Sequence, residues 1–175
     1  MSEGFNVIEP MEIDVQDVKE QRSVLPARKD VKLRIKKAEL RERRVQSEEK
    51  GGTGADNPVV TRSLNLSLSL VDGYEDGKYK GFPLFQDVMY WADLNVKKGD
   101  WYGNKQHLVQ LRFLLSALGL PMKTTIGDQF IQEITGRELL GSIRTRKVQV
   151  FDPSTGKYVD TDDLRNEVGG YKASI

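Results

Sequence analysis

The strongest constraint on the fold is a leucine-rich stretch, residues 104–121. Leucines recur there at steps of three and four residues among polar positions, which predicts a helix with one buried face. Asn104 is a suitable N-cap, Gly119 stands where a left-handed residue ends a helix, and Pro121 prevents continuation. We therefore expect this helix to lie across a sheet. The stripe comprises Leu108, Leu111, Leu115 and Leu118, widened by Phe113 and Leu114.

Alternating patterns before this helix predict strands. Val31, Leu33 and Ile35 alternate with lysine and arginine, which on a strand places aliphatic groups on one face and cations on the other. Residues 36–44 are also compatible with a helix, so the end of this strand stays open. In residues 64–70 leucines alternate with serine and asparagine, the clearest period-2 run in the chain. It predicts a second strand with one buried face.

The second strand leads into a hairpin. Residues 72–77 are rich in aspartate, glutamate and glycine and predict the turn. The chain returns through residues 79–91 as a third strand, in which Pro83 indicates an edge position or a bulge.

The part after the helix supplies the remaining strands. The order of three strands, helix, and two or three strands is typical of the OB-fold, a five-stranded, partly open Greek-key barrel with a helix between strands three and four. We therefore predict a mainly β, OB-fold-like barrel; another small α+β sheet domain or a β-sandwich with one helix is the alternative. The pattern predicts a short helix or turn at 126–134, a strand at 142–151, a turn at 152–157, and strand segments at 158–159 and 167–173.

Length and composition limit the class of protein. At 175 residues we expect one OB-fold-like domain over residues 24–175, a flexible acidic arm at 1–23 and a long flexible loop at 46–58. No apolar run has the length of a membrane helix, and the first residues are acidic, so we expect a cytoplasmic protein, in the host cell if viral. The chain has no cysteine and a single histidine, His107, which we expect to be exposed. We therefore predict no metal site and no cofactor.

Charge is distributed unevenly along the chain. The formal net charge is +1, but residues 1–22 hold six acidic and two basic residues, a balance of −4. Residues 28–44 hold nine basic and three acidic residues, a balance of +6. Such a basic segment indicates a polyanionic partner, and the acidic arm is a candidate for competing with that partner or for binding replication proteins.

Several soft motifs give the chain a family resemblance over about residues 24–173. It resembles a family of small bacteriophage proteins of unknown function, usually encoded beside replication and recombination genes and suspected of binding single-stranded DNA. The resemblance implies an OB-like fold and a role in DNA replication or recombination. The matching features are Leu25, Pro26 and Ala27 before the basic strand; Tyr79, Lys80 and Gly81; the stretch from Leu84 to Trp91; Leu115 to Gly119; and Thr135, Gly136 and Arg137 before a second basic strand.

Single-stranded DNA requires cations along its backbone and flat side chains on which bases stack. Alternate residues on a strand lie about 7 Å apart, close to the phosphate spacing of an extended single strand. The candidate phosphate contacts are Lys32, Arg34, Lys36, Arg144, Arg146 and Lys147, and the candidate stacking residues are Trp91, Trp101 and Tyr102.

Each candidate has a structural alternative. Phe82, Phe85 and Tyr90 are expected in the core, since a small barrel needs large side chains. The basic strand can equally be a solvated face with ion pairs from Glu39 and Glu42.

The sequence contains little that is typical of an enzyme. The glycine-rich residues 51–54 lack the lysine of a phosphate-binding loop, and Asp160, Asp162 and Asp163 lack the rest of a calcium loop. We predict a non-enzymatic, sequence-independent single-stranded DNA-binding protein, which can also form homo-oligomers. A structural or replisome adaptor is the first alternative and a metal-dependent nuclease the second.

The charge asymmetry generates a test of the arm. If the acidic arm competes with DNA for the basic segment, deleting residues 1–22 should tighten binding of an oligothymidylate at low salt, because six carboxylates are removed. Fluorescence anisotropy at 50 mM salt measures this, and unchanged affinity would refute competition.

Overall fold

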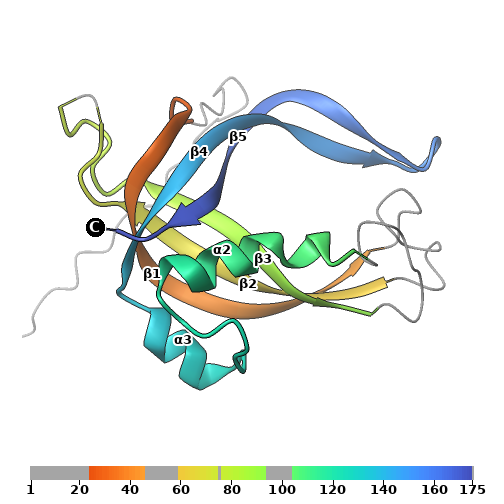
Figure 1. Cartoon of the computed structure of the whole chain (residues 1–175). Coiled ribbons are helices and arrows are strands. Elements are labelled where there is room, and N and C mark those ends of the chain that lie inside the picture. The colour runs from red at the N-terminus through yellow and green to blue at the C-terminus, as the bar shows by residue number, and fades with distance from the viewer. Residues whose placement is uncertain (1–23, 46–58, 75, 94–103, 175) are drawn as a thin grey trace, which may run out of the picture.

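The computed structural model describes residues 24–45, 59–74, 76–93 and 104–174. Its five strands form one antiparallel sheet in the order β3-β2-β1-β4-β5, and the helices lie between β3 and β4 in sequence (Figure 1). The mainly β prediction with one or two helices is confirmed. The elements are β1 (Arg28–Val45), β2 (Val59–Leu70), β3 (Pro83–Ala92), η2 (Gln106–Leu108), α2 (Val109–Ala117), α3 (Asp128–Ile134), β4 (Glu138–Asp152) and β5 (Lys157–Lys172).

The long strand β1 joins the two halves of the sheet, because it pairs with β2 on one side and β4 on the other. Its register with β2 shifts between Ile35 and Lys37, and at this point Ile35 exchanges backbone hydrogen bonds with Gly136 and Arg137. Val31, Leu33 and Ile35 are buried as predicted. The strand continues to Val45, so residues 36–44 are not a helix.

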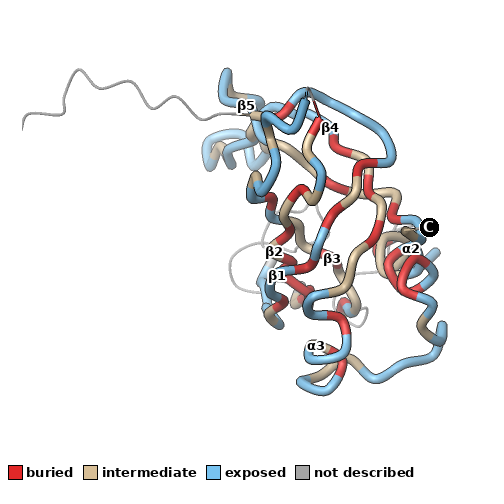
Figure 2. Tube along the Cα trace, turned by 90° about the vertical axis from the view of Figure 1, so that its left-hand side faces the viewer, coloured by how far each residue is buried: buried red, intermediate tan, exposed pale blue. Residues whose placement is uncertain are grey.

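The core lies on the inner face of the curved sheet. The alternation predicted for residues 64–70 is confirmed, with Leu64, Leu66 and Leu68 almost inaccessible to solvent. Buried aliphatic residues of β1 and β4 complete this face, and Figure 2 shows buried residues gathered where the strands and α2 face one another.

Helix α2 packs against β5 and β3, the two edges of the sheet. The Gln110 side chain on α2 accepts a hydrogen bond from the Gly170 backbone nitrogen at 3.2 Å, and the Gln86 side chain on β3 accepts one from the Val168 nitrogen at 2.9 Å. Two part-buried backbone N–H groups of the edge strand β5 thereby donate hydrogen bonds to glutamine side-chain oxygens. The helix and these side chains hold the edges of the open sheet near each other.

The predicted helix is present but shorter than residues 104–121. Gly119 has the expected left-handed backbone, with φ of 65°, but Lys105 rather than Asn104 is the residue before the first 3₁₀ turn. Phe113 was expected to widen the buried stripe, yet its exposed fraction is 42%. The buried face of this helix is narrower than the leucine spacing indicates, because only Leu114, Leu115 and Leu118 of the predicted stripe are buried.

His107 was expected to be exposed, and this prediction is wrong. Its exposed fraction is 7%, because the 3₁₀ turn before α2 packs against β3. Burial disfavours the imidazolium ion and lowers the pKa of His107 below its usual value, so the ring is neutral at pH 7.

The prediction that Pro83 lies at an edge is confirmed, since it is the first residue of the edge strand β3. The end of the chain differs from expectation because β5 is one continuous strand, not two segments. Beyond the core, β4 and β5 extend as a two-stranded ribbon (Figure 1) whose residues are largely exposed (Figure 2). The expected arm at 1–23 and loop at 46–58 lie outside the described residues.

Gly141 on β4 tests how tightly the inner face is packed. A Cβ atom at this position would lie 2.8 Å from the Leu33 Cδ1 atom and 3.0 Å from the Val168 Cγ1 atom. Gly141→Ala should lower the free energy of unfolding by about 1–3 kcal/mol through overpacking. Urea denaturation measures this, and Ser116→Ala on the exposed side of α2 should change stability by less than about 0.5 kcal/mol. Equal stability of wild type and Gly141→Ala would contradict the packing.

Candidate nucleic-acid interface

The first group of predicted cations lies where β1 pairs with β4. Arg34 lies opposite Glu138 in the register, and its guanidinium contacts this carboxylate at 2.5 Å. The Lys32 ammonium lies 3.4 Å from the other oxygen of Glu138. The hydrogen bond from Arg34, followed by that from Lys32, lowers the pKa of Glu138. We call Lys32, Arg34 and Glu138 the β1–β4 cluster, in which one carboxylate serves two cations.

Lys36 lies at the register shift of β1, with its side chain exposed. Within the described part of the chain no carboxylate forms an ion pair with it. Farther along β1 the expected alternative of ion pairs is found, since Glu39 contacts Lys37 and Arg41, and Glu42 contacts Arg62. The basic strand is thus partly neutralised by its own acidic residues.

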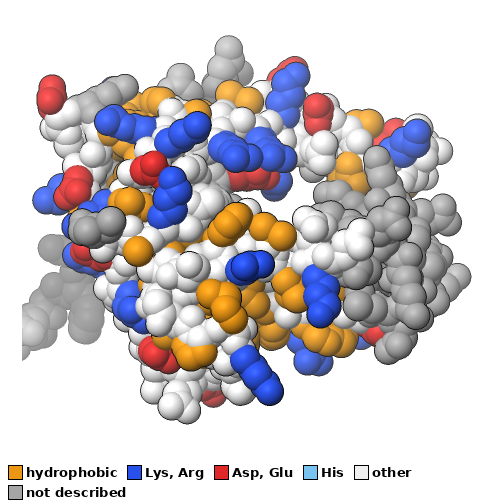
Figure 3. All heavy atoms as spheres, in the orientation of Figure 1, with side chains coloured by type: hydrophobic (Ala, Val, Ile, Leu, Met, Phe, Trp, Pro, Cys, Tyr) orange, Lys and Arg blue, Asp and Glu red, His pale blue; other side chains and the backbone are white. Residues whose placement is uncertain are grey.

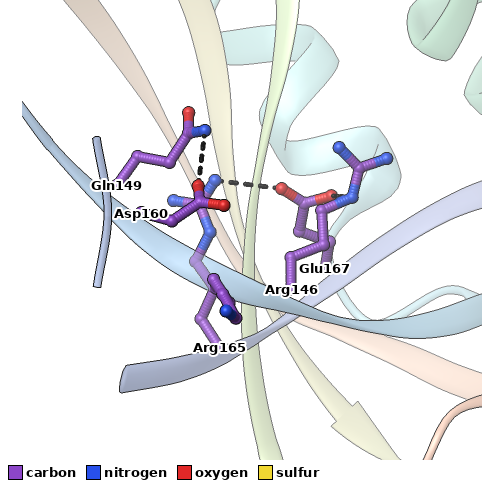
Figure 4. A pocket seen from close by; sticks show the side chains of 6 residues that line it. Arg146, Gln149, Asp160, Arg165 and Glu167 are labelled. Atoms are coloured by element: carbon purple, nitrogen blue, oxygen red, sulfur yellow. Dashed lines mark hydrogen bonds and ion pairs between the residues drawn. The ribbon is translucent and has the colours of Figure 1, made fainter. Parts of the chain in front are cut away.

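The second group of predicted cations lies on the ribbon of β4 and β5. The Glu167 carboxylate forms ion pairs with the guanidinium groups of Arg146, at 2.8 Å, and Arg165, at 2.9 Å (Figure 4). Arg144 and Lys147 are exposed and form no ion pair with any residue that the structure describes. We call Arg144, Arg146, Lys147, Arg165 and Glu167 the ribbon cluster.

The ribbon cluster, except for Arg144, borders a shallow pocket of about 250 Å³. A hydrogen bond of 2.9 Å from the Gln149 amide to Asp160 closes one side of it (Figure 4). Lysine and arginine side chains lie along the upper part of Figure 3, where the ribbon runs, with acidic side chains interspersed among them. The pocket offers an excess of positive charge to an anionic group.

Apart from Lys147, the two clusters lie on the same side of the sheet. Glu138 and Arg144 are six residues apart on β4, an even number, and residues 139, 141 and 143 between them point into the core. At the usual rise per residue this separation is about 20 Å. The structure therefore places Lys32, Arg34, Arg144 and Arg146 on the outer surface, at separate points along the sheet. Lys147 lies nine residues from Glu138, an odd number, and points to the opposite face of the ribbon.

The predicted aromatic residues have different outcomes. Trp91 is 38% exposed, but the Arg62 guanidinium lies 4.7 Å from the centre of its ring and also contacts Glu42 at 3.3 Å. A cation–π contact therefore occupies part of the surface on which a base would stack. Trp101 and Tyr102 lie outside the described residues.

Phe85 was expected in the core, and this prediction is wrong. Its exposed fraction is 64%, because it lies opposite Ser67 on the outer face of β3, whereas its neighbour Leu84 is buried. Phe82 and Tyr90 do pack against the core, as expected. The alternation itself carried the signal, since Leu84 and Val88 share one face and polar Asp87 shares the other with Phe85.

Comparisons with known proteins add no relationship, because no protein-family model matches the chain and the curated proteins contain no match. Among the described residues no group of three histidine, cysteine or acidic side chains is placed to hold a metal ion. No helix in the described segments is long and apolar enough to span a bilayer.

Glu138 allows a test of the β1–β4 cluster. Glu138→Gln removes the carboxylate that engages Lys32 and Arg34, so affinity for an oligothymidylate should rise about two- to fivefold. Because the pKa of Glu138 is lowered from its usual 4.5, the difference should persist at pH 5. The control is Glu133→Gln on the exposed side of α3, which changes net charge equally. An equal increase in both variants would contradict a local effect.

Proposed function

We propose that this protein binds single-stranded DNA without sequence preference and that its sheet is an OB-fold-like barrel. The strand order β3-β2-β1-β4-β5, the helices between β3 and β4, and the contacts between β3 and β5 support this fold assignment. The observation that carries the function is the placement of two cation pairs on one outer surface, Lys32 with Arg34 at the junction of β1 and β4 and Arg144 with Arg146 on the ribbon.

The arrangement suits binding through phosphates. Ion pairs between exposed side chains contribute little stability, so a phosphate can replace Glu138 beside Arg34 or Glu167 beside Arg146 at small cost. Each phosphate that is neutralised releases counterions, which makes binding strong at low salt and weak at high salt. Cations that contact only the backbone do not distinguish one base from another.

The biological setting rests on the resemblance to phage proteins alone. On that basis we place the activity in phage DNA replication or recombination, within the host cytoplasm. Binding of replication proteins through the acidic arm belongs to the same proposal.

A second function is favoured by a different observation. Four large apolar residues near the end of the ribbon are 41–52% exposed. Two of them, Val150 and Val159, lie opposite each other in the strand register. Exposed apolar groups of this kind are typical of a contact with another protein, so an adaptor role or homo-oligomer is the alternative. A stable oligomer that binds no DNA would favour it. The four residues are Val150, Phe151, Val159 and Leu164.

A salt titration tests the proposed function. Anisotropy of a labelled oligothymidylate should show binding at 50 mM salt that falls steeply by 300 mM. Arg144→Ala combined with Arg146→Ala should reduce the slope of log affinity against log salt by about 1.4, the value for two lost contacts to a single strand. The control is Arg112→Ala combined with Lys123→Ala, two exposed cations outside the sheet with the same charge change.

Two outcomes would refute the proposal. If the wild type does not bind the oligothymidylate at 50 mM salt, the proposed DNA binding is refuted. An equal loss in the control pair would show that net charge, not the ribbon, determines affinity.

A further inference from the structure

The outer face of β1, β2 and β3 contains a strip of small side chains between two different borders. Ser67 and Ser69 on β2 are half-buried and form the middle of the strip. In the strand register, Lys37 on β1 and Phe85 on β3 lie opposite Ser67, and Arg34 and Pro83 lie opposite Ser69. We call this surface the serine strip. It has cations along one edge and apolar rings along the other.

The cationic edge continues the β1–β4 cluster. Arg34 belongs to both, and Lys37 follows it beyond the register shift with its side chain 65% exposed. The nearest acidic partner of Lys37 is Glu39, which is also exposed, so this ion pair is displaceable.

Phe85 forms the opposite edge. It is the most exposed of the large apolar residues in the described segments, at 64%. Within those segments no aromatic ring or cation lies against its ring, in contrast to Trp91 under Arg62. A phenylalanine in this position exposes a flat apolar surface that folding does not use.

The strip has a defined end. Arg43 on β1 forms an ion pair with Asp87 on β3, and this pair must cross over β2, which lies between those strands. Asp87 also accepts a 2.7 Å hydrogen bond from the Asn65 amide, and Asn65 and Ser63 are buried. The open part of the strip is therefore limited to the Ser67 and Ser69 end.

We propose that the serine strip is the path of a single DNA strand, with Phe85 stacking on a base and Arg34 and Lys37 contacting phosphates. This inference rests on the proposed function and names its base-binding site. Neighbouring strands lie about 4.8 Å apart, so the two edges are about 10 Å apart, a separation that an extended nucleotide bridges from phosphate to base. The serine side chains are small, so the DNA strand can approach the sheet closely.

The same geometry selects the kind of nucleic acid. A base must leave its partner to lie on Phe85, so a duplex cannot use this edge. Stacking on one ring accepts every base, which agrees with binding that lacks sequence preference.

The test compares two oligomers and two phenylalanines. Phe85→Ala should weaken binding of an oligothymidylate about tenfold and leave an abasic oligomer of equal length unchanged, because only the former has bases to stack. Phe113→Ala, at a 42% exposed residue on α2, should change neither. Phe85→Tyr retains a ring and should restore wild-type affinity, and urea denaturation checks that all variants are folded.

The outcomes separate this inference from the proposed function. If the wild type binds the oligothymidylate and Phe85→Ala binds it equally well, the stacking site is wrong while DNA binding stands. Equal weakening for both oligomers would also overturn it, since the effect would not depend on bases. No binding by the wild type would refute the proposed function itself. Tighter binding of an oligouridylate than of the oligothymidylate would overturn the choice of DNA.

Discussion

Every feature described above depends on the double pairing of β1. A strand of 18 residues is long enough to pair with β2 over most of its length and with β4 near its start. Its register shift near Lys36 bends the strand, as an extra residue does in a β-bulge, and allows one sheet to enclose a core. The same backbone carries the cations of the outer surface, so fold and candidate interface share one strand.

The two edges of the sheet are held near each other by two glutamine side chains and helix α2. Gln86 and Gln110 each satisfy one backbone nitrogen of β5, and α2 covers the gap between β3 and β5. Edge strands with unpaired amides invite aggregation, and a helix across the gap prevents this. The leucine face of α2 is therefore explained by closure of the sheet.

The outer surface combines near-neutral charge with available cations. Glu138 and Glu167 each engage two basic side chains, which keeps arginines oriented without burying them. Exposed pairs of this kind are weak, so a phosphate of the proposed partner would displace the carboxylate and find the donors already positioned. A formal net charge of +1 is thus compatible with a polyanion as the proposed partner.

Much of the strand pattern was predictable, because side chains alternate between the two faces of a strand whatever the neighbours are. The leucines of residues 64–70, the edge position of Pro83 and the left-handed Gly119 follow from local rules. The failures have a common cause. His107 and Phe85 were judged by residue type, but their exposure is set by which element packs on them. Residue type is a weaker guide than position on an element.

The sequence by itself determined the strands, the helix, the basic segment and the choice of aliphatic residues for the core, since alternation, helix termini and charge are local properties of the chain. Only the tertiary structure decided that Arg34 meets Glu138 across 104 residues, that Trp91 lies under Arg62, and that Phe85 lies opposite Ser67. These contacts depend on strand order and register, which arise from the balance of many distant pairings and cannot be read from any one segment.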